Sequence, residues 1–330
     1  MNTPSTMRAV VVSRPGGPEV LELVDRPVPE PVEGEVVIRI RAFGLNRAEL
    51  FTRQGDSGPA VAFPRVIGIE CVGSVEAAPG TDLEPGQTVV AMMGGMGRAF
   101  DGSYAEFTRV PRCSVFPVET TLDWATLGAL PEMFQTCNGS LTTGLRAEAG
   151  QTLLIRGGTS SIGMTTAALA KRGGLRVLST TRNPAKAAAL EAVGVDDVIT
   201  DEGGSLVDAV HRVLPEGADR VLELIGTTTL ADSLRCAAHG GIVCMTGMLG
   251  GSWVWDGFEP FVDIPNGVCL TSYGGGSEDV TAAELQSYID SVAAGAIPAN
   301  LDRTFSLDEI RDAHRYMEAN RAKGKVVVVT

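Results

Sequence analysis

The sequence is poor in basic residues. Lysine and arginine number 27 against 40 aspartates and glutamates, which leaves a formal net charge of −13. Such a chain is repelled by nucleic-acid phosphates and by anionic lipid unless a basic patch is gathered in the fold. We therefore expect neither a nucleic acid nor a membrane as its partner.

Paired cysteines and clustered histidines are missing as well. No two of the six cysteines form a C-x-x-C pair, and none of the three histidines lies four residues from another or beside a cysteine. This spacing excludes a zinc ribbon and a dithiol redox motif, and we predict no metal site. The residues concerned are Cys71, Cys113, Cys137, Cys236, Cys244, Cys269, His211, His239 and His314.

Long apolar runs are also absent. No stretch approaches the roughly 20 apolar residues of a membrane helix, and residues 1–10 lack the apolar centre of a signal peptide. We therefore expect a soluble, cytoplasmic protein. With 44% hydrophobic and 20% charged residues in 330, the composition is globular and large enough for two domains.

The first hundred or so residues are typical of a β-rich, barrel-like unit. Short apolar segments are separated by glycine and proline, and one helical stretch interrupts them at 46–54. We predict strands at 9–13, 21–25, 35–42, 71–77, 88–92 and 104–110.

From residue 151 onward, strand and helix patterns alternate, which indicates a doubly wound parallel sheet. Six strands are predicted, at 152–156, 176–181, 197–200, 218–225, 241–246 and 268–272. A lone strand at 325–329 is unstable by itself, so we expect the tail to return to the N-terminal domain. The predicted fold is α/β, with a first domain of 1–125 and 275–330 and a nucleotide-binding domain of 126–274.

The strongest chemical signal is the segment LLIRGGTSSIG at 153–163. A strand that enters a tight glycine turn and then a helix directs backbone N–H groups and the positive helix end at a pyrophosphate. Gly158 and Gly163 match the pattern G-x-G-x-x-G, whereas Ser160 replaces the middle glycine. The predicted dinucleotide contacts are Gly158, Thr159, Ser160, Ser161, Ile162 and Gly163.

The end of the second strand of this domain indicates which dinucleotide binds. An NAD site usually places a carboxylate there for the ribose hydroxyls, but residues 179–186 contain none. Thr181, Arg182 and Lys186 can instead neutralise and hydrogen-bond a 2′-phosphate. We therefore expect NADPH; the alternative is that both cations only solvate a helix start.

Taken together, these and further segments resemble the medium-chain dehydrogenase/reductase superfamily, and within it the zinc-independent quinone oxidoreductase branch. The resemblance covers essentially the whole chain and implies a GroES-like catalytic domain built from both chain ends, an inserted Rossmann domain, and a cleft where nicotinamide meets substrate. The matching segments are GLNRAE at 44–49, PRVIGIE at 64–70, GSYAE at 102–106, ALP at 129–131, the glycine turn, and GKVV at 324–327.

The chain departs from the zinc-dependent alcohol dehydrogenases of that superfamily. They carry a cysteine where Asn46 stands and Gly-His-Glu where this chain has Gly-Ile-Glu at 68–70, and their cysteine-rich lobe has no counterpart at 92–101. Without a Lewis acid, reduction of a simple carbonyl is harder, whereas a quinone or an enone delocalises the developing charge. Related quinone oxidoreductases often have a tyrosine where Phe51 stands.

The resemblance and the chain positions together imply the remaining site residues. Tyr104 is a catalytic candidate, or else a core aromatic, and the aromatics of 251–261 form either a substrate lid or a dimer seam. The family commonly pairs through the edge of the Rossmann sheet near 268–272, so we expect a homodimer. The candidates are Asn46 and Tyr104 for catalysis; Asn46, Thr136, Thr246, Gly247, Met248, Leu249, Tyr273 and Lys325 for cofactor; and Phe51, Trp253 and Trp255 for substrate.

The leading functional hypothesis is an NADPH-dependent, metal-free reductase of a quinone or an activated enone. One alternative is a reductase of the C=C bond in an enoyl thioester or enone. A second alternative, from another class, is an NADPH-binding sensor or structural protein without turnover.

Overall fold

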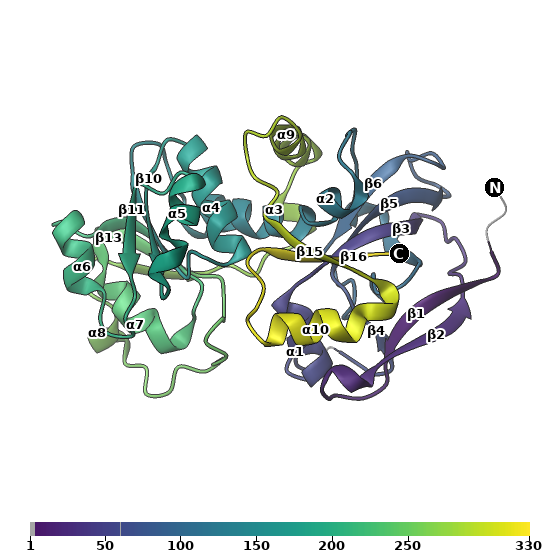
Figure 1. The fold of residues 1–330 in the computed structure, drawn as a ribbon, viewed down its shortest axis with the longest axis horizontal. Helices are drawn as coiled ribbons and strands as arrows, with labels where there is room; N and C mark the ends of the chain where they lie inside the picture. Colours follow the sequence, from purple (N-terminus) through teal and green to yellow (C-terminus); the bar gives the residue numbers. More distant parts are fainter. Residues whose placement is uncertain (1–3, 60) are drawn as a thin grey trace. The chain divides into compact units, whose positions relative to one another are not determined.

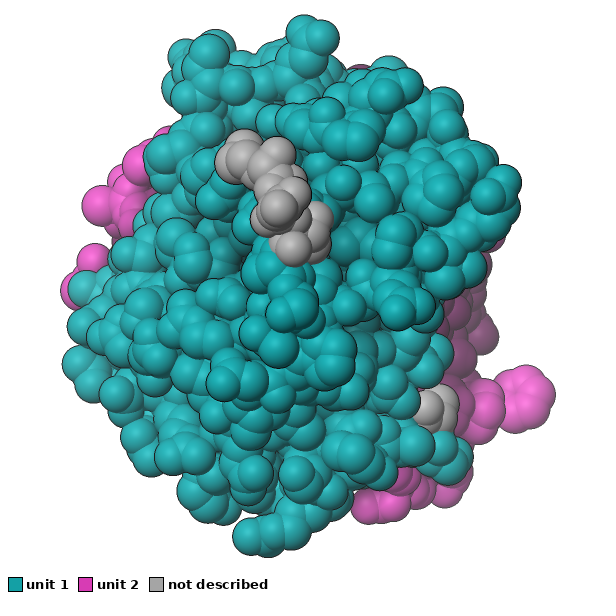
Figure 2. All heavy atoms as spheres, turned by 90° about the vertical axis from the view of Figure 1, so that its right-hand side faces the viewer, with its two compact units in different colours: residues 1–134, 276–330 teal, residues 135–275 magenta. Residues whose placement is uncertain are grey.

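The computed structural model describes residues 4–59 and 61–330, and the chain divides into two compact units. Figure 2 colours unit 1, residues 1–134 and 276–330, apart from unit 2, residues 135–275. The first boundary therefore lies after residue 134 rather than after 125. Helix α3, Pro131–Gly139, begins in unit 1 and ends in unit 2.

Unit 1 is built on two sheets. A three-stranded sheet has the order β2-β1-β4, and a seven-stranded sheet has the order β15-β16-β3-β5-β6-β8, with β7 paired to β3. The strands are β1 Thr6–Val12, β2 Leu21–Pro27, β3 Glu35–Leu45, β4 Arg65–Val66, β5 Glu70–Ala77, β6 Thr88–Met92, β7 Phe107–Pro111, β8 Val115–Pro117, β15 Leu301–Ser306 and β16 Lys325–Val329.

The two ends of the chain meet in the larger sheet. Strand β16 pairs antiparallel with β3, so that Val326 lies opposite Leu45 and Val329 opposite Ala42. The return of the tail to the N-terminal domain is thus confirmed (Figure 1). This register brings Lys325 next to the residues that follow β3.

Helices and short turns cover these sheets. They are α1 Arg47–Gln54, α2 Trp124–Gly128, α9 Ala282–Ala293 and α10 Ile310–Glu318, with 3-10 turns at Pro18–Val20, Arg112–Ser114, Ser277–Asp279 and Leu307–Glu309. Helix α1 starts at Asn46, whose backbone N–H donates to the Glu49 side chain, and it stops at Gly55 in the left-handed conformation, φ 91°.

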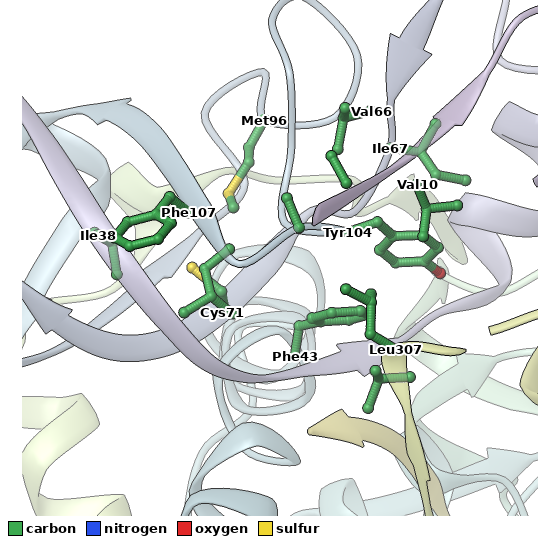
Figure 3. Packing of buried hydrophobic residues seen from close by; sticks show 14 of the residues in the cluster. Val10, Ile38, Phe43, Val66, Ile67, Cys71, Met96, Tyr104, Phe107 and Leu307 are labelled. Carbon is green, nitrogen blue, oxygen red and sulfur yellow. The ribbon is translucent and has the colours of Figure 1, made fainter. Parts of the chain in front are cut away.

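The core of unit 1 joins residues from distant parts of the chain. Figure 3 shows Val10, Phe43, Tyr104 and Leu307 packed together, and each of them is at most 1% exposed. Burying an aliphatic or aromatic side chain contributes about 1.5–3 kcal/mol, so such contacts stabilise the closure of the sheet by the C-terminal segment.

Unit 2 contains the predicted parallel sheet. Its six strands have the order β11-β10-β9-β12-β13-β14, and every neighbouring pair is parallel. The strands are β9 Thr152–Arg156, β10 Arg176–Thr181, β11 Asp197–Thr200, β12 Ala218–Glu223, β13 Ala237–Met245 and β14 Cys269–Ser272. The doubly wound α/β fold is confirmed.

The helices of unit 2 lie on both faces of this sheet, with α4 and α5 on one side and α7 on the other (Figure 1). A π-helical turn, Ser140–Gly144, continues α3. The remaining elements are α4 Ser161–Arg172, a 3-10 turn Pro184–Lys186, α5 Ala187–Ala192, α6 Val207–Val213, α7 Thr227–Arg235 and α8 Pro260–Asp263.

Some predicted bounds shift. The strand expected at 104–110 runs from Phe107 to Pro111, so Tyr104 precedes it. Helix α7, Thr227–Arg235, is followed by β13, which begins at Ala237 and thus four residues before the strand predicted at 241–246. Among the described residues, no helix is both long enough and apolar enough to span a bilayer.

Candidate active site

The turn between β9 and α4 has the geometry of a phosphate cradle. The N–H of Gly157 donates to Thr180 Oγ1 at 3.0 Å, which ties the turn to β10. A Cβ at Gly158 would lie 1.7 Å from Ser179 Oγ, and one at Gly163 would lie 2.7 Å from Gly158 Cα. Both glycines are therefore required by close packing, independently of any ligand.

Ser160 replaces the middle glycine because it closes the turn. Its hydroxyl donates to Gly157 O at 2.9 Å and accepts from Gly163 N–H at 3.0 Å, so it is the N-cap of α4. The N–H groups of Ser161 and Ile162 precede the intrahelical hydrogen bonds and add to the positive helix end. The structure thus brings residues 158–163, Thr159 included, into one turn.

Thr181, Arg182 and Lys186 follow β10, and they differ in what they offer to a ligand. The Thr181 hydroxyl donates to Asn183 O at 3.0 Å and accepts from Asn183 N–H at 3.1 Å. Its single hydrogen is used inside the turn in this conformation, so the predicted hydrogen bond to a 2′-phosphate requires the hydroxyl to turn away from Asn183. Arg182 is exposed and Lys186 half-buried, and neither belongs to the ion pairs found among the described residues of unit 2.

Three predicted cofactor residues gather around the end of α3 and its π-helical turn. Ser140 Oγ donates to Thr136 O at 2.6 Å and lies 2.9 Å from Thr246 Oγ1, so Thr246 donates in that second contact. Gln135 Nε2 donates to Tyr273 Oη at 2.7 Å. Sequence reasoning missed Gln135 and Ser140, although they lie one residue before and four residues after Thr136 on a helical pattern.

The segment after β13 is held by β12. The N–H groups of Gly247 and Leu249 donate to Glu223 O at 3.2 Å and Leu224 O at 3.0 Å. These two N–H groups are thus used within unit 2 in this conformation, and contact of residues 246–249 with a cofactor stays a prediction. Leu249 remains 36% exposed.

The two tryptophans that were predicted to contact the substrate differ in their surroundings. Trp255 packs on the core of unit 2 and its ring lies 4.5 Å from that of Phe258, so it has a structural role. Trp253 is 53% exposed. Further exposed apolar side chains surround it in sequence: Val254, Phe258, Phe261 and Val262.

Unit 1 holds a buried cluster of charged side chains centred on Lys325. The ammonium Nζ lies 2.7 Å from Glu70 Oε1 and 3.0 Å from Glu132 Oε2, and it also donates to Asn46 Oδ1. Burial acts to lower the pKa of Lys325, but the carboxylates of Glu70 and Glu132 raise that pKa above its usual value. Lys325 therefore stays charged although it is only 2% exposed.

Asn46 completes this cluster. Its Nδ2 donates to Glu70 Oε1 at 2.9 Å and to Glu49 Oε1 at 3.3 Å, and its backbone N–H donates to Glu49 Oε2 at 2.8 Å. An ammonium can only donate and a carboxylate only accepts, so the partners fix which end of the amide is oxygen. The helix-cap role and the site role of Asn46 therefore coexist.

Glu49, Glu70 and Glu132 were not among the predicted site residues. Glu49 also accepts from Ile69 N–H at 3.1 Å, and burial together with Glu70 raises its pKa to about 7. Glu70 Oε2 accepts from Glu132 N–H at 2.8 Å. The spacing Asn46-x-x-Glu49 was the available sequence signal, because it is that of a capping box.

Tyr104 lies in the core, which favours the second of its two predicted readings, a core aromatic, over a catalytic role. It is 0% exposed, its ring stacks on Phe43 at 4.8 Å, and its hydroxyl lies 3.0 Å from His314 Nε2. Arg53 Nη1 donates to His314 Nδ1 at 3.0 Å, so the histidine is neutral and donates from Nε2 to Tyr104. Phe51, the substrate candidate, is half-buried on α1.

Comparison with known families matches both units. The model described as "Alcohol dehydrogenase GroES-like domain" matches residues 32–120, and "Zinc-binding dehydrogenase" matches residues 193–328. A quinone oxidoreductase of Rattus norvegicus is 30% identical over 251 residues, which cover 74% of this chain and 74% of that protein.

Solved structures agree over nearly the full length. A structure described as an NAD-dependent alcohol dehydrogenase has a TM-score of 0.86 and 26% identity, covering 98% of this chain and 100% of that chain. A mycobacterial protein solved in complex with NADPH has a TM-score of 0.85 and 25% identity, with the same coverage of 98% and 100%.

These relatives support an NAD(P)-dependent oxidoreductase with a GroES-like unit and a Rossmann-like unit. The agreement extends through both units, and it includes the segments on which the sequence resemblance rested. The chain belongs to the medium-chain dehydrogenase/reductase superfamily, in its quinone oxidoreductase-like branch.

Proposed function

We propose that this protein is an NADPH-dependent oxidoreductase that transfers a hydride to a quinone or an activated enone without zinc. The observation that carries the proposal is the buried ammonium of Lys325 among Asn46, Glu70 and Glu132. The Lys325 ammonium already binds the oxygen atoms that a metal ion at this position would need as ligands.

Zinc does not fit this set of residues. It is usually bound by thiolate, imidazole or carboxylate, but the chain offers an amide at Asn46 and an apolar side chain at Ile69. The described residues contain no group of three or more His, Cys, Asp or Glu side chains placed to hold a metal. The Glu70 carboxylate already binds Lys325 and Asn46, so the proposed reaction does not involve a metal ion.

NADPH fits the residues of unit 2. The turn after β9 is closed by two tightly packed glycines, and the first turn of α4 presents backbone N–H groups there. Arg182 and Lys186 follow β10 without a neighbouring carboxylate in residues 179–186. Two cations in an acidic chain favour the extra phosphate that distinguishes NADPH from NADH.

The class of hydride acceptor follows from the hydrogen-bond donors that unit 1 can offer. When bound, the reduced nicotinamide supplies the hydride. The three N–H bonds of the Lys325 ammonium point to Asn46, Glu70 and Glu132, and the Asn46 amide hydrogens point to carboxylates. The cluster thus has no strong donor left for an isolated carbonyl oxygen, whereas a quinone or enone spreads the charge itself. The proton that completes the reduction comes from solvent or a weak donor.

A homodimer and a cytoplasmic location belong to the same proposal. Strand β14 ends the sheet of unit 2, and an exposed edge strand can pair with a second copy. The exposed apolar side chains of 253–262 favour such pairing. All six cysteines lie within the described residues and none forms a disulfide, in keeping with a reducing compartment.

The test is oxidation of NADPH by chelator-treated protein with a 1,4-quinone, a short enone, an enoyl thioester and a simple aldehyde, and with NADH in parallel. We expect turnover of the quinone or the enone, a preference for NADPH, and no gain from added zinc. Turnover of the thioester alone would favour the alternative C=C reductase. Binding of NADPH without any turnover would replace the proposal by a sensor or structural role.

A further inference from the structure

The amide of Asn46 has its hydrogen-bonding capacity almost fully committed. Both hydrogens of Nδ2 are directed at carboxylates, at 2.9 Å to Glu70 and 3.3 Å to Glu49. One lone pair of Oδ1 accepts from Lys325 Nζ. An amide oxygen has two lone pairs, so what Asn46 has left for a ligand is one acceptor position and no donor.

Lys325 sets this polarity. If the amide were turned over, its NH₂ group would meet the ammonium and its oxygen would meet the carboxylate of Glu70, so both of these charged contacts would be repulsive. The ammonium is itself held from two other sides, at 2.7 Å by Glu70 and 3.0 Å by Glu132. Neither the cation nor the amide can therefore rotate without breaking buried, charge-assisted hydrogen bonds.

We propose that Lys325 is a positioning residue that holds Asn46 as a pure hydrogen-bond acceptor, so that Asn46 binds a hydroxyl of a ligand and not the developing oxyanion. This inference rests on the proposed function and refines it. The hydroxyl has two possible sources, a ribose of the reduced cofactor or the hydroquinone that quinone reduction produces.

Two variants and one control isolate the effect. Asn46→Ala removes the acceptor. Glu132→Gln with Lys325→Met removes one charge of each sign, so the net charge of the cluster is unchanged and Glu70 keeps its bond to Asn46. Lys323→Met removes one positive charge two residues earlier at an exposed site, and thermal melts show which variants are folded.

Two ratios show which hydroxyl Asn46 binds. The first compares kcat/KM for NADPH with that for an analogue lacking the 2′-hydroxyl of the nicotinamide ribose. The second compares inhibition by a hydroquinone with inhibition by its dimethyl ether. We expect one of the two ratios to be about tenfold in the unmodified protein, as for one hydrogen bond, and near one in N46A. The double variant should lose most of that ratio, and K323M should keep it.

Two results would overturn the inference. In the first, N46A lowers kcat but changes neither ratio, which is the behaviour of an oxyanion donor. In the second, the double variant keeps the full ratio that N46A loses, which would show that Asn46 needs no help from Lys325. If the protein oxidises no NADPH, the first ratio is measured as a Kd ratio from cofactor fluorescence, so failure of the proposed function is separable from failure of this inference.

Discussion

The two cations that follow β10 carry the proposed preference for NADPH over NADH. In the double variant Arg182→Ala/Lys186→Ala we expect kcat/KM for NADPH to fall about 10- to 100-fold, because two charge-assisted hydrogen bonds contribute roughly 1.5–3 kcal/mol together at partly exposed positions. The value for NADH should change little. The measurement is the ratio of the two kcat/KM values.

A matched control removes two exposed cations elsewhere in unit 2. Arg212→Ala/Arg235→Ala makes the same change in net charge at the ends of α6 and α7 and should leave the ratio intact. An equal loss for NADPH and NADH in the R182A/K186A variant would show that these cations do not recognise the 2′-phosphate.

For single residues, the sequence predicts which residue types lie in the site better than it predicts which of their atoms are available to bind a ligand. It singled out Asn46 and Lys325 separately, but their contact spans 279 positions and depends on the pairing of β16 with β3. The hydroxyls of Thr181 and Thr246 were predicted as ligand contacts, and only the folded backbone shows that their hydrogens are already used. Only the folded chain shows that the Tyr104 hydroxyl contacts His314, which lies 210 positions away, and this contact favours the core reading of Tyr104.

Among the elements, strand β14 and the segment that precedes it carry a prediction about assembly. Phe261 is fully exposed on α8, and Val262 is 67% exposed. The homodimer proposed above would bury these apolar side chains, because an exposed apolar surface and an open sheet edge both favour association. We expect Phe261→Asp to shift a dimer toward monomer in size-exclusion chromatography with light scattering.

The control for this variant is Val32→Asp, which places the same charge at an apolar side chain that is 43% exposed in unit 1. It should leave the dimer unchanged. A monomer in the unmodified protein, or a dimer that F261D does not weaken, would assign the segment a different role, such as a cover over the substrate.

Element length explains which parts of the fold could be predicted. The strands of unit 2 read as apolar runs between turn residues, and all six were placed within a few positions. Strand β8 has three residues and α8 has four, which is too short for any periodicity to show. The π-helical turn also escaped prediction, because its hydrogen bonding follows from the packing around Tyr273 and not from local propensity.

For the whole molecule, His314 predicts a loss of stability in acid. Burial, together with Arg53, lowers its pKa to about 3 in the folded protein, against 6.5 for an ordinary histidine. Below pH 6.5 the unfolded chain binds this proton and the folded protein does not, so the free energy of unfolding falls by up to about 1.4 kcal/mol per pH unit. Above pH 6.5 the contribution is constant.

The variant His314→Gln tests this slope, since an amide can accept from Arg53 and donate to Tyr104 without titrating. We expect urea unfolding of H314Q to depend less on pH than that of the unmodified protein between pH 6.5 and about 5. His239→Gln, at an exposed site on β13, should keep the original slope. Parallel slopes for all three proteins would mean that His314 is not held neutral.

The pairing of β3 with β16 also affects the order in which parts of the molecule can fold during synthesis on the ribosome. All of unit 2 is synthesised between these two strands, so the nucleotide-binding unit can fold while β3 still lacks its neighbour. Glu70 also precedes its countercharge in the order of synthesis, because Lys325 follows all of unit 2 in the chain. The turn after β9 can therefore form before the buried charged cluster of unit 1 is complete.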